Sequence, residues 1–100
     1  MYQTIITNRA IADIEKAKKW YDEQQENLGV KFADYVFNCI SDISKHPLHY
    51  PNKHKFTREK FIKKYPYLII YSVEQSIIFI LRVFPCKTNP KKKYKPIKNK

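Results

Sequence analysis

The apolar residues of this 100-residue chain change their spacing about halfway along the sequence. Before residue 46 they recur every three or four positions, which is the spacing of one face of an α-helix. Residues 67–71 and 77–81 are instead uninterrupted apolar runs, typical of buried β-strands and far too short to span a membrane. Because 100 residues provide one hydrophobic core, both patterns have to share a single small domain.

Two helices are expected in the first half of the chain. The first begins after a capping side chain at Thr7 or Asn8 and runs to about Glu26. Its apolar stripe consists of Ile11, Ile14, Ala17 and Tyr21, with Trp20 beside it. The stripe of the second helix consists of Ala33, Val36, Phe37, Ile40 and Ile43. Pro47 ends this helix because proline cannot continue the hydrogen-bond ladder, and the short break at Gly29 predicts an antiparallel helical hairpin.

Four strands are expected around this hairpin. They comprise residues 2–6, 56–64, 66–73 and 77–84, and a loop at 48–52 precedes the second of them. The order β-α-α-β-β-β predicts an α+β fold, with the two-helix hairpin packed on one face of an antiparallel sheet. We expect this single domain to occupy residues 1–86 and a basic C-terminal tail to occupy residues 87–100.

Positive charge is concentrated in the second half of the chain. The sequence has 20 Lys and Arg against nine Asp and Glu, a net charge of +11, which favours polyanionic partners. Residues 87–100 hold seven lysines and no acid, and six basic residues lie between 53 and 64. An aromatic residue in a basic segment can stack on a base. The residues expected to bind nucleic acid are Lys63, Lys64, Lys91, Lys92, Lys93 and Tyr94.

A basic groove is expected on the sheet face away from the helices. Arg82 interrupts an otherwise apolar strand at the same parity as Ile78, Ile80 and Phe84, while Arg58 and Lys60 share a parity in an earlier strand. If those faces coincide, Arg58, Lys60 and Arg82 converge, with Lys87 at the rim. Guanidinium groups clamp phosphates with two parallel hydrogen bonds, so the arginines would lie at the centre. The alternative is that Arg82 pairs with Glu59 or Glu74 at a sheet edge.

The sequence gives no support for a metal or cofactor site. Cys39 falls on the apolar face of the second helix, and Cys86 lies far from it, so neither a disulfide framework nor a zinc site is expected. The three histidines lie in a loop without a ligand pattern, and the single glycine excludes a glycine-rich phosphate loop. The first residues resemble no signal peptide, so we expect a cytoplasmic location.

An ordered series of short motifs resembles the RelE/ParE toxin superfamily, in particular the branch often labelled plasmid stabilization proteins. The series comprises residues 10–13, Trp20-Tyr21-Asp22-Glu23-Gln24, Leu28-Gly29 with Phe32, His46-Pro47, Tyr50-Pro51, Arg58, Tyr65-Pro66-Tyr67, Tyr71, and Val83-Phe84 through Asn89-Pro90. It extends over nearly the whole chain. The resemblance implies a small toxin that is neutralised by a cognate antitoxin, whose extended C-terminal segment wraps around it.

Members of the superfamily differ in their targets. RelE-like members cleave messenger RNA at the ribosome, using basic residues that hold the phosphate, whereas ParE-like members inhibit DNA gyrase and lack that nuclease set. Arg58 and Arg82 match the basic positions on the sheet, and Lys87 matches a position often held by arginine. Pro85 departs from the pattern, because relatives frequently carry a histidine there and proline cannot act as a general acid or base.

Three functions remain open from the sequence. The first is a type II toxin that acts as a ribosome-dependent mRNA interferase, a metal-independent endoribonuclease whose catalytic residues would be Arg58, Lys60, Arg82 and Lys87. The second is a type II toxin that inhibits DNA gyrase. The third is a basic module that binds nucleic acid without catalysis. The partners are then an antitoxin and either the ribosome with its mRNA or gyrase; no membrane and no cofactor are expected.

Overall fold

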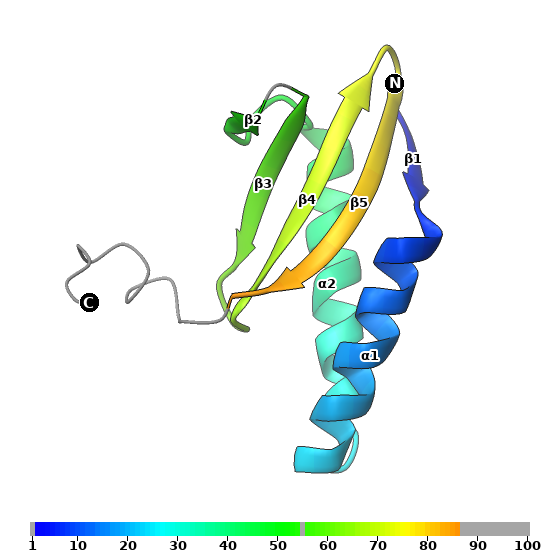
Figure 1. The fold of residues 1–100 in the computed structure, drawn as a ribbon, viewed down its shortest axis with the longest axis vertical. Coiled ribbons are helices and arrows are strands. Elements are labelled where there is room, and N and C mark those ends of the chain that lie inside the picture. Colours follow the sequence, from blue (N-terminus) through cyan, green and yellow to red (C-terminus); the bar gives the residue numbers. More distant parts are fainter. Residues whose placement is uncertain (1, 55, 87–100) are drawn as a thin grey trace, which may run out of the picture.

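The computed structural model describes residues 2–54 and 56–86. Two helices lie side by side against one face of a sheet, as expected for an α+β domain (Figure 1). The elements are β1 (Gln3–Ile6), α1 (Asn8–Gln24), α2 (Leu28–Lys45), β2 (Asn52–His54), β3 (Thr57–Ile62), β4 (Tyr67–Glu74) and β5 (Ile77–Pro85). The short strand β2 was not predicted, because three residues between prolines give no periodic signal. No helix in the described part of the chain is long and apolar enough to cross a membrane.

The sheet has five strands in the order β1-β5-β4-β3-β2. Strands β2 to β5 pair antiparallel, as expected for strands joined by short turns. Strand β1 pairs parallel with the first half of β5, from Ile77 to Ile80, so the sheet is mixed and the expectation of a purely antiparallel sheet is corrected here. The whole domain separates these two strands in sequence, so no local turn fixes their relative direction.

The core lies between the helices and the sheet face formed by alternate residues of β4 and β5. Ile69 and Tyr71 of β4 and Ile78 and Ile80 of β5 are fully buried there. The helices contribute Ala10, Ile14, Ala17, Tyr21, Phe32, Ala33, Val36, Ile40 and Ile43. The expected stripes were too wide by one residue each, since Ile11 and Phe37 are 45% and 46% exposed. Both lie at the margin of a helix face that is otherwise correctly assigned.

The helical hairpin is closed by a contact between Asp22 and Gly29. Asn27, at the N-cap of α2, has a left-handed backbone (φ 66°) and makes no side-chain capping bond. The carboxylate of Asp22 in α1 instead accepts from the Gly29 N–H at 2.7 Å. A Cβ built on Gly29 would lie 2.3 Å from the Lys18 carbonyl oxygen, so only glycine permits this approach of the helices. At the start of α1, Thr7 caps the Ala10 N–H, as predicted.

Candidate functional site

A β-bulge places Arg82 on the opposite side of β5 from Ile80. In the β4–β5 register, Tyr71 pairs with Ile80 and Ile70 with Arg82, so Leu81 is the extra residue. Ile78, Ile80 and Val83 therefore point to the helices, while Arg82 and Phe84 start from the other face. The parity argument from the sequence assumed an unbroken alternation, and the bulge breaks it between Ile80 and Arg82.

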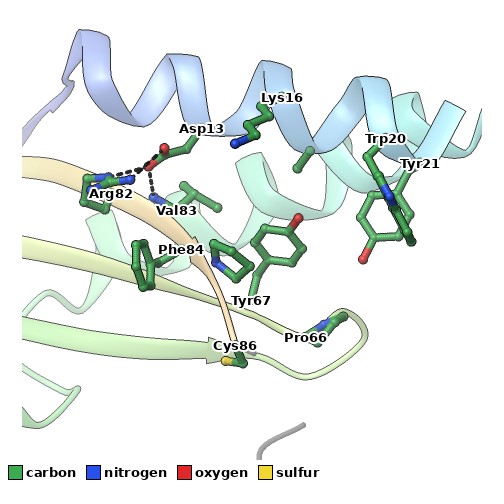
Figure 2. A pocket seen from close by; sticks show the side chains of 12 residues that line it. Asp13, Lys16, Trp20, Tyr21, Pro66, Tyr67, Arg82, Val83, Phe84 and Cys86 are labelled. Carbon is green, nitrogen blue, oxygen red and sulfur yellow. Dashed lines mark hydrogen bonds and ion pairs between the residues drawn. The ribbon is translucent and has the colours of Figure 1, made fainter. Parts of the chain in front are cut away.

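The side chain of Arg82 meets Asp13 of α1 at the edge of β5 (Figure 2). Its Nε donates to Oδ2 of Asp13 at 2.7 Å and its Nη2 donates to Oδ1 at 3.1 Å. The backbone N–H of Val83 also donates to Oδ2, at 3.0 Å. The Asp13 carboxylate thus joins α1 to both a side chain and the main chain of β5. Arg82 pairs with neither Glu59 nor Glu74, the partners that the sequence suggested.

The electrostatics of this contact are consistent with a permanent ion pair. Partial burial alone would raise the pKa of Asp13, but the hydrogen bonds from Arg82 and Val83 and the charge of Arg82 outweigh it and lower the pKa below 3.8. The hydrogen bond to Asp13 raises the pKa of Arg82 in turn. Both groups are therefore charged at neutral pH, and two of the guanidinium donors are occupied.

Arg58 and Lys60 lie on the helix-facing side of β3. In the β3–β4 register Arg58 pairs with Tyr71 and Lys60 with Ile69, both of which point into the core. Nη1 of Arg58 donates to the Tyr50 carbonyl oxygen at 2.7 Å. Lys60 Nζ donates to the Tyr50 hydroxyl at 3.1 Å and lies 4.5 Å from the centre of its ring. Both basic residues thus contact the loop that follows α2.

Tyr71 anchors the same loop from the core. Its hydroxyl donates to the Pro47 carbonyl oxygen at 2.6 Å, and burial is the main cause that raises its pKa to about 12. Arg58 and Tyr71, which are neighbours across β3 and β4, therefore hold two carbonyl groups of one loop. The expected convergence of Arg58, Lys60 and Arg82 on one groove is not observed, because β4 separates the strands and the side chains leave opposite faces.

The remaining residues expected to bind nucleic acid are only partly described. Lys63 and Lys64 are exposed at the turn between β3 and β4, and the ammonium of Lys64 lies 6.0 Å from the rings of Tyr35 and Tyr65. The other proposed site residues, Lys87, Lys91, Lys92, Lys93 and Tyr94, lie outside the described residues. Cys39 is buried, as expected, and burial raises the pKa of its thiol. Within residues 2–54 and 56–86, no cluster of His, Cys, Asp and Glu could hold a metal ion.

A groove that the sequence did not predict lies between α1 and the end of β5, beside the Asp13–Arg82 pair (Figure 2). Its volume is about 410 Å³. Trp20 of α1 and Phe84 of β5 line it and are 52% and 41% exposed, while Lys16 adds a positive charge. The only signal in the sequence was the position of Trp20 beside the apolar stripe of the first helix. An exposed tryptophan facing an exposed phenylalanine is typical of a protein-binding surface.

Comparisons with known proteins agree with this architecture. Residues 4–90 match the family described as the ParE toxin of the type II toxin–antitoxin system parDE. Among solved structures, a chain of the chromosomal ParDE toxin–antitoxin system from P. aeruginosa matches with a TM-score of 0.80 at 16% sequence identity. The alignment covers 87% of this chain and 98% of that one. No curated protein sequence matches the chain. With nearly all of its described residues inside the family match, the chain belongs to the ParE toxins of type II toxin–antitoxin systems.

Proposed function

We propose that this toxin inhibits DNA gyrase by binding it, and that it does not cleave RNA. The observation that carries the proposal is the state of Arg82, the residue best placed by sequence to clamp a phosphate. Its guanidinium is held by both carboxylate oxygens of Asp13. A phosphate could be clamped only after this pair is broken, at the cost of leaving a partly buried carboxylate without its partner.

The other residues of the expected nuclease set also support a non-catalytic mode. Stabilising a pentacoordinate phosphate requires several donors directed at one point in space. Arg58 and Lys60 are directed at Tyr50 on the helix side of the sheet, whereas Arg82 is directed at the edge of β5. Pro85 provides no acid or base after the last strand. Among the described residues, no arrangement of free cations surrounds a common phosphate position.

Two assays with the same purified chain test this proposal. In the first, gyrase supercoils a relaxed plasmid with ATP while the toxin concentration is raised, and topoisomerase I acting on the same plasmid is the control. In the second, a reconstituted translation reaction is followed for cleavage of its mRNA. We expect loss of gyrase supercoiling, unchanged relaxation by topoisomerase I, and intact mRNA.

The opposite results distinguish the remaining functions. Cleavage of mRNA that requires the ribosome, with supercoiling unaffected, would overturn the proposal and support an interferase. Binding to nucleic acid without either effect would instead support a non-enzymatic module. The family membership implies a cognate antitoxin, which should suppress whichever activity is observed.

A further inference from the structure

The outer edge of β5 is covered by a neighbouring strand over only half its length. β1 pairs with residues from Ile77 to Ile80 and then turns into α1, while β5 continues to Pro85. An uncovered strand edge offers main-chain donors and acceptors to any other strand, including one from a second copy of the same chain. The end of β5 therefore needs protection if this chain is to avoid pairing with itself.

The polar groups on this edge already have partners within the chain. The Thr7 hydroxyl donates to the carbonyl oxygens of Ile80, at 2.9 Å, and Leu81, at 3.3 Å. The N–H of Val83 donates to Asp13 at 3.0 Å. Main-chain groups alternate between the two sides of a strand, so the next residue facing this edge is Pro85, which has no N–H. Val83 is therefore the one donor on this edge beyond Leu81, and Asp13 occupies it.

Bulk alone does not close the edge. The groove between α1 and β5 runs beside Val83, Phe84 and Pro85, and its volume of about 410 Å³ leaves the strand accessible from the side. What prevents another strand from pairing there is a hydrogen bond to a single carboxylate. That carboxylate is fixed in turn by Arg82, which makes two hydrogen bonds to it.

We infer that Asp13 guards the edge of β5: its carboxylate takes the place of a strand partner at Val83 and so prevents a second copy of this chain from pairing there. Arg82 is a positioning residue in this device, because it orients the carboxylate without touching the main chain of Val83 through any hydrogen bond of its own. This inference concerns self-association and does not depend on whether gyrase is the target.

Three single variants separate the guard from the ion pair. Asp13→Ala removes the acceptor and leaves the Val83 N–H available. Asp13→Asn keeps an oxygen acceptor and loses the charge, and Arg82→Ala keeps the carboxylate and loses the ion pair. Each variant of the full chain is measured for molar mass by light scattering over a range of concentrations, and for amide hydrogen exchange at Val83.

We expect only Asp13→Ala to form dimers or larger species as concentration rises, with faster exchange at Val83 where it is still monomeric. Asp13→Asn and Arg82→Ala should keep the molar mass of the unmodified chain. A folded Asp13→Ala that also keeps this mass would overturn the inference. Equal association of all three variants would do the same, since it would point to general destabilisation. If Asp13→Ala does not fold, Asp13→Ala/Arg82→Ala opens the same edge without leaving an unpaired guanidinium.

Discussion

At the scale of single residues, the pairing of Arg82 with Asp13 determines what each of them contributes. A bidentate contact between guanidinium and carboxylate has a geometry that lysine cannot reproduce, because an ammonium is a single point of charge. Arg82 is also 5.1 Å from the ring of Phe84, measured from its Cζ, which adds a packing contact at the same edge. Both features make Arg82 a residue of the fold.

Arg82→Lys therefore tests the role of this residue. We expect growth arrest by the expressed toxin to persist, because the target surface is retained, and the melting temperature of the purified protein to fall. Lys19→Ala, on the exposed side of α1, is the control and should change neither property. Loss of toxicity at an unchanged melting temperature would show that Arg82 contacts the target directly.

The pH dependence of stability provides a second test at this scale. The pKa of Asp13 is lower in the folded chain than its ordinary value of 3.8, so the ion pair stabilises the fold above that value. This contribution disappears as the pH falls through the lowered pKa of the folded state. We expect the difference in unfolding free energy between the unmodified chain and Asp13→Asn to be constant above about pH 5 and to shrink in stronger acid. Urea unfolding at several pH values measures it, and a difference that is the same at every pH would contradict the assignment.

At the scale of elements, the helical hairpin depends on one close contact. Gly29→Ala would place a methyl group 2.3 Å from the Lys18 carbonyl oxygen. We expect a loss of about 1–3 kcal/mol of stability from this overpacking, although alanine is intrinsically the better helix former. Asn38→Ala, at an exposed position of the same helix, is the matched control and should be nearly neutral in chemical denaturation. Equal stability of the two variants would mean that the helices separate easily at Gly29.

The contact between α2 and the core gives a prediction of larger size. Ile40 is 5% exposed, so Ile40→Ala should cost about 2–5 kcal/mol by leaving a cavity. Phe37→Ala removes a larger side chain from the same helix, but that side chain is 46% exposed and should cost much less. A loss for Ile40→Ala below about 0.5 kcal/mol would mean that the packed face of α2 is assigned incorrectly.

The elements that could be predicted from the sequence are those with a local cause. The helices follow from apolar spacing, their ends from Thr7 and Pro47, and the β4–β5 hairpin from two apolar runs around a short turn. The parallel position of β1 and the bulge at Leu81 have no such cause, since both are decided by contacts between distant segments. The candidate site failed at the bulge, because one inserted residue reverses the face of every later side chain.

At the scale of the whole molecule, charge is distributed very unevenly. Removing residues 87–100 leaves 13 basic and nine acidic residues, so the net charge drops from +11 to +4. Every residue of the core cluster lies between Ala10 and Val83, so the tail contributes no part of that core. The charge that favours a polyanionic partner and the packing that maintains the fold are therefore carried by different parts of the sequence.

Truncation after Cys86 tests this separation. We expect the shortened chain to keep its circular dichroism and melting temperature, because the core cluster is complete without the tail. Its binding to DNA, measured by fluorescence anisotropy at several salt concentrations, should depend less on salt. Each lysine–phosphate contact that is lost should lower the slope of log affinity against log salt by roughly 0.9 for duplex DNA and 0.7 for single strands. A full-length variant with Lys91, Lys92 and Lys93 changed to alanine is the control for chain length and should show an intermediate slope. If truncation leaves the slope unchanged, the tail makes no phosphate contacts, and the basic residues between Arg58 and Lys64 become the surface to test for nucleic-acid binding.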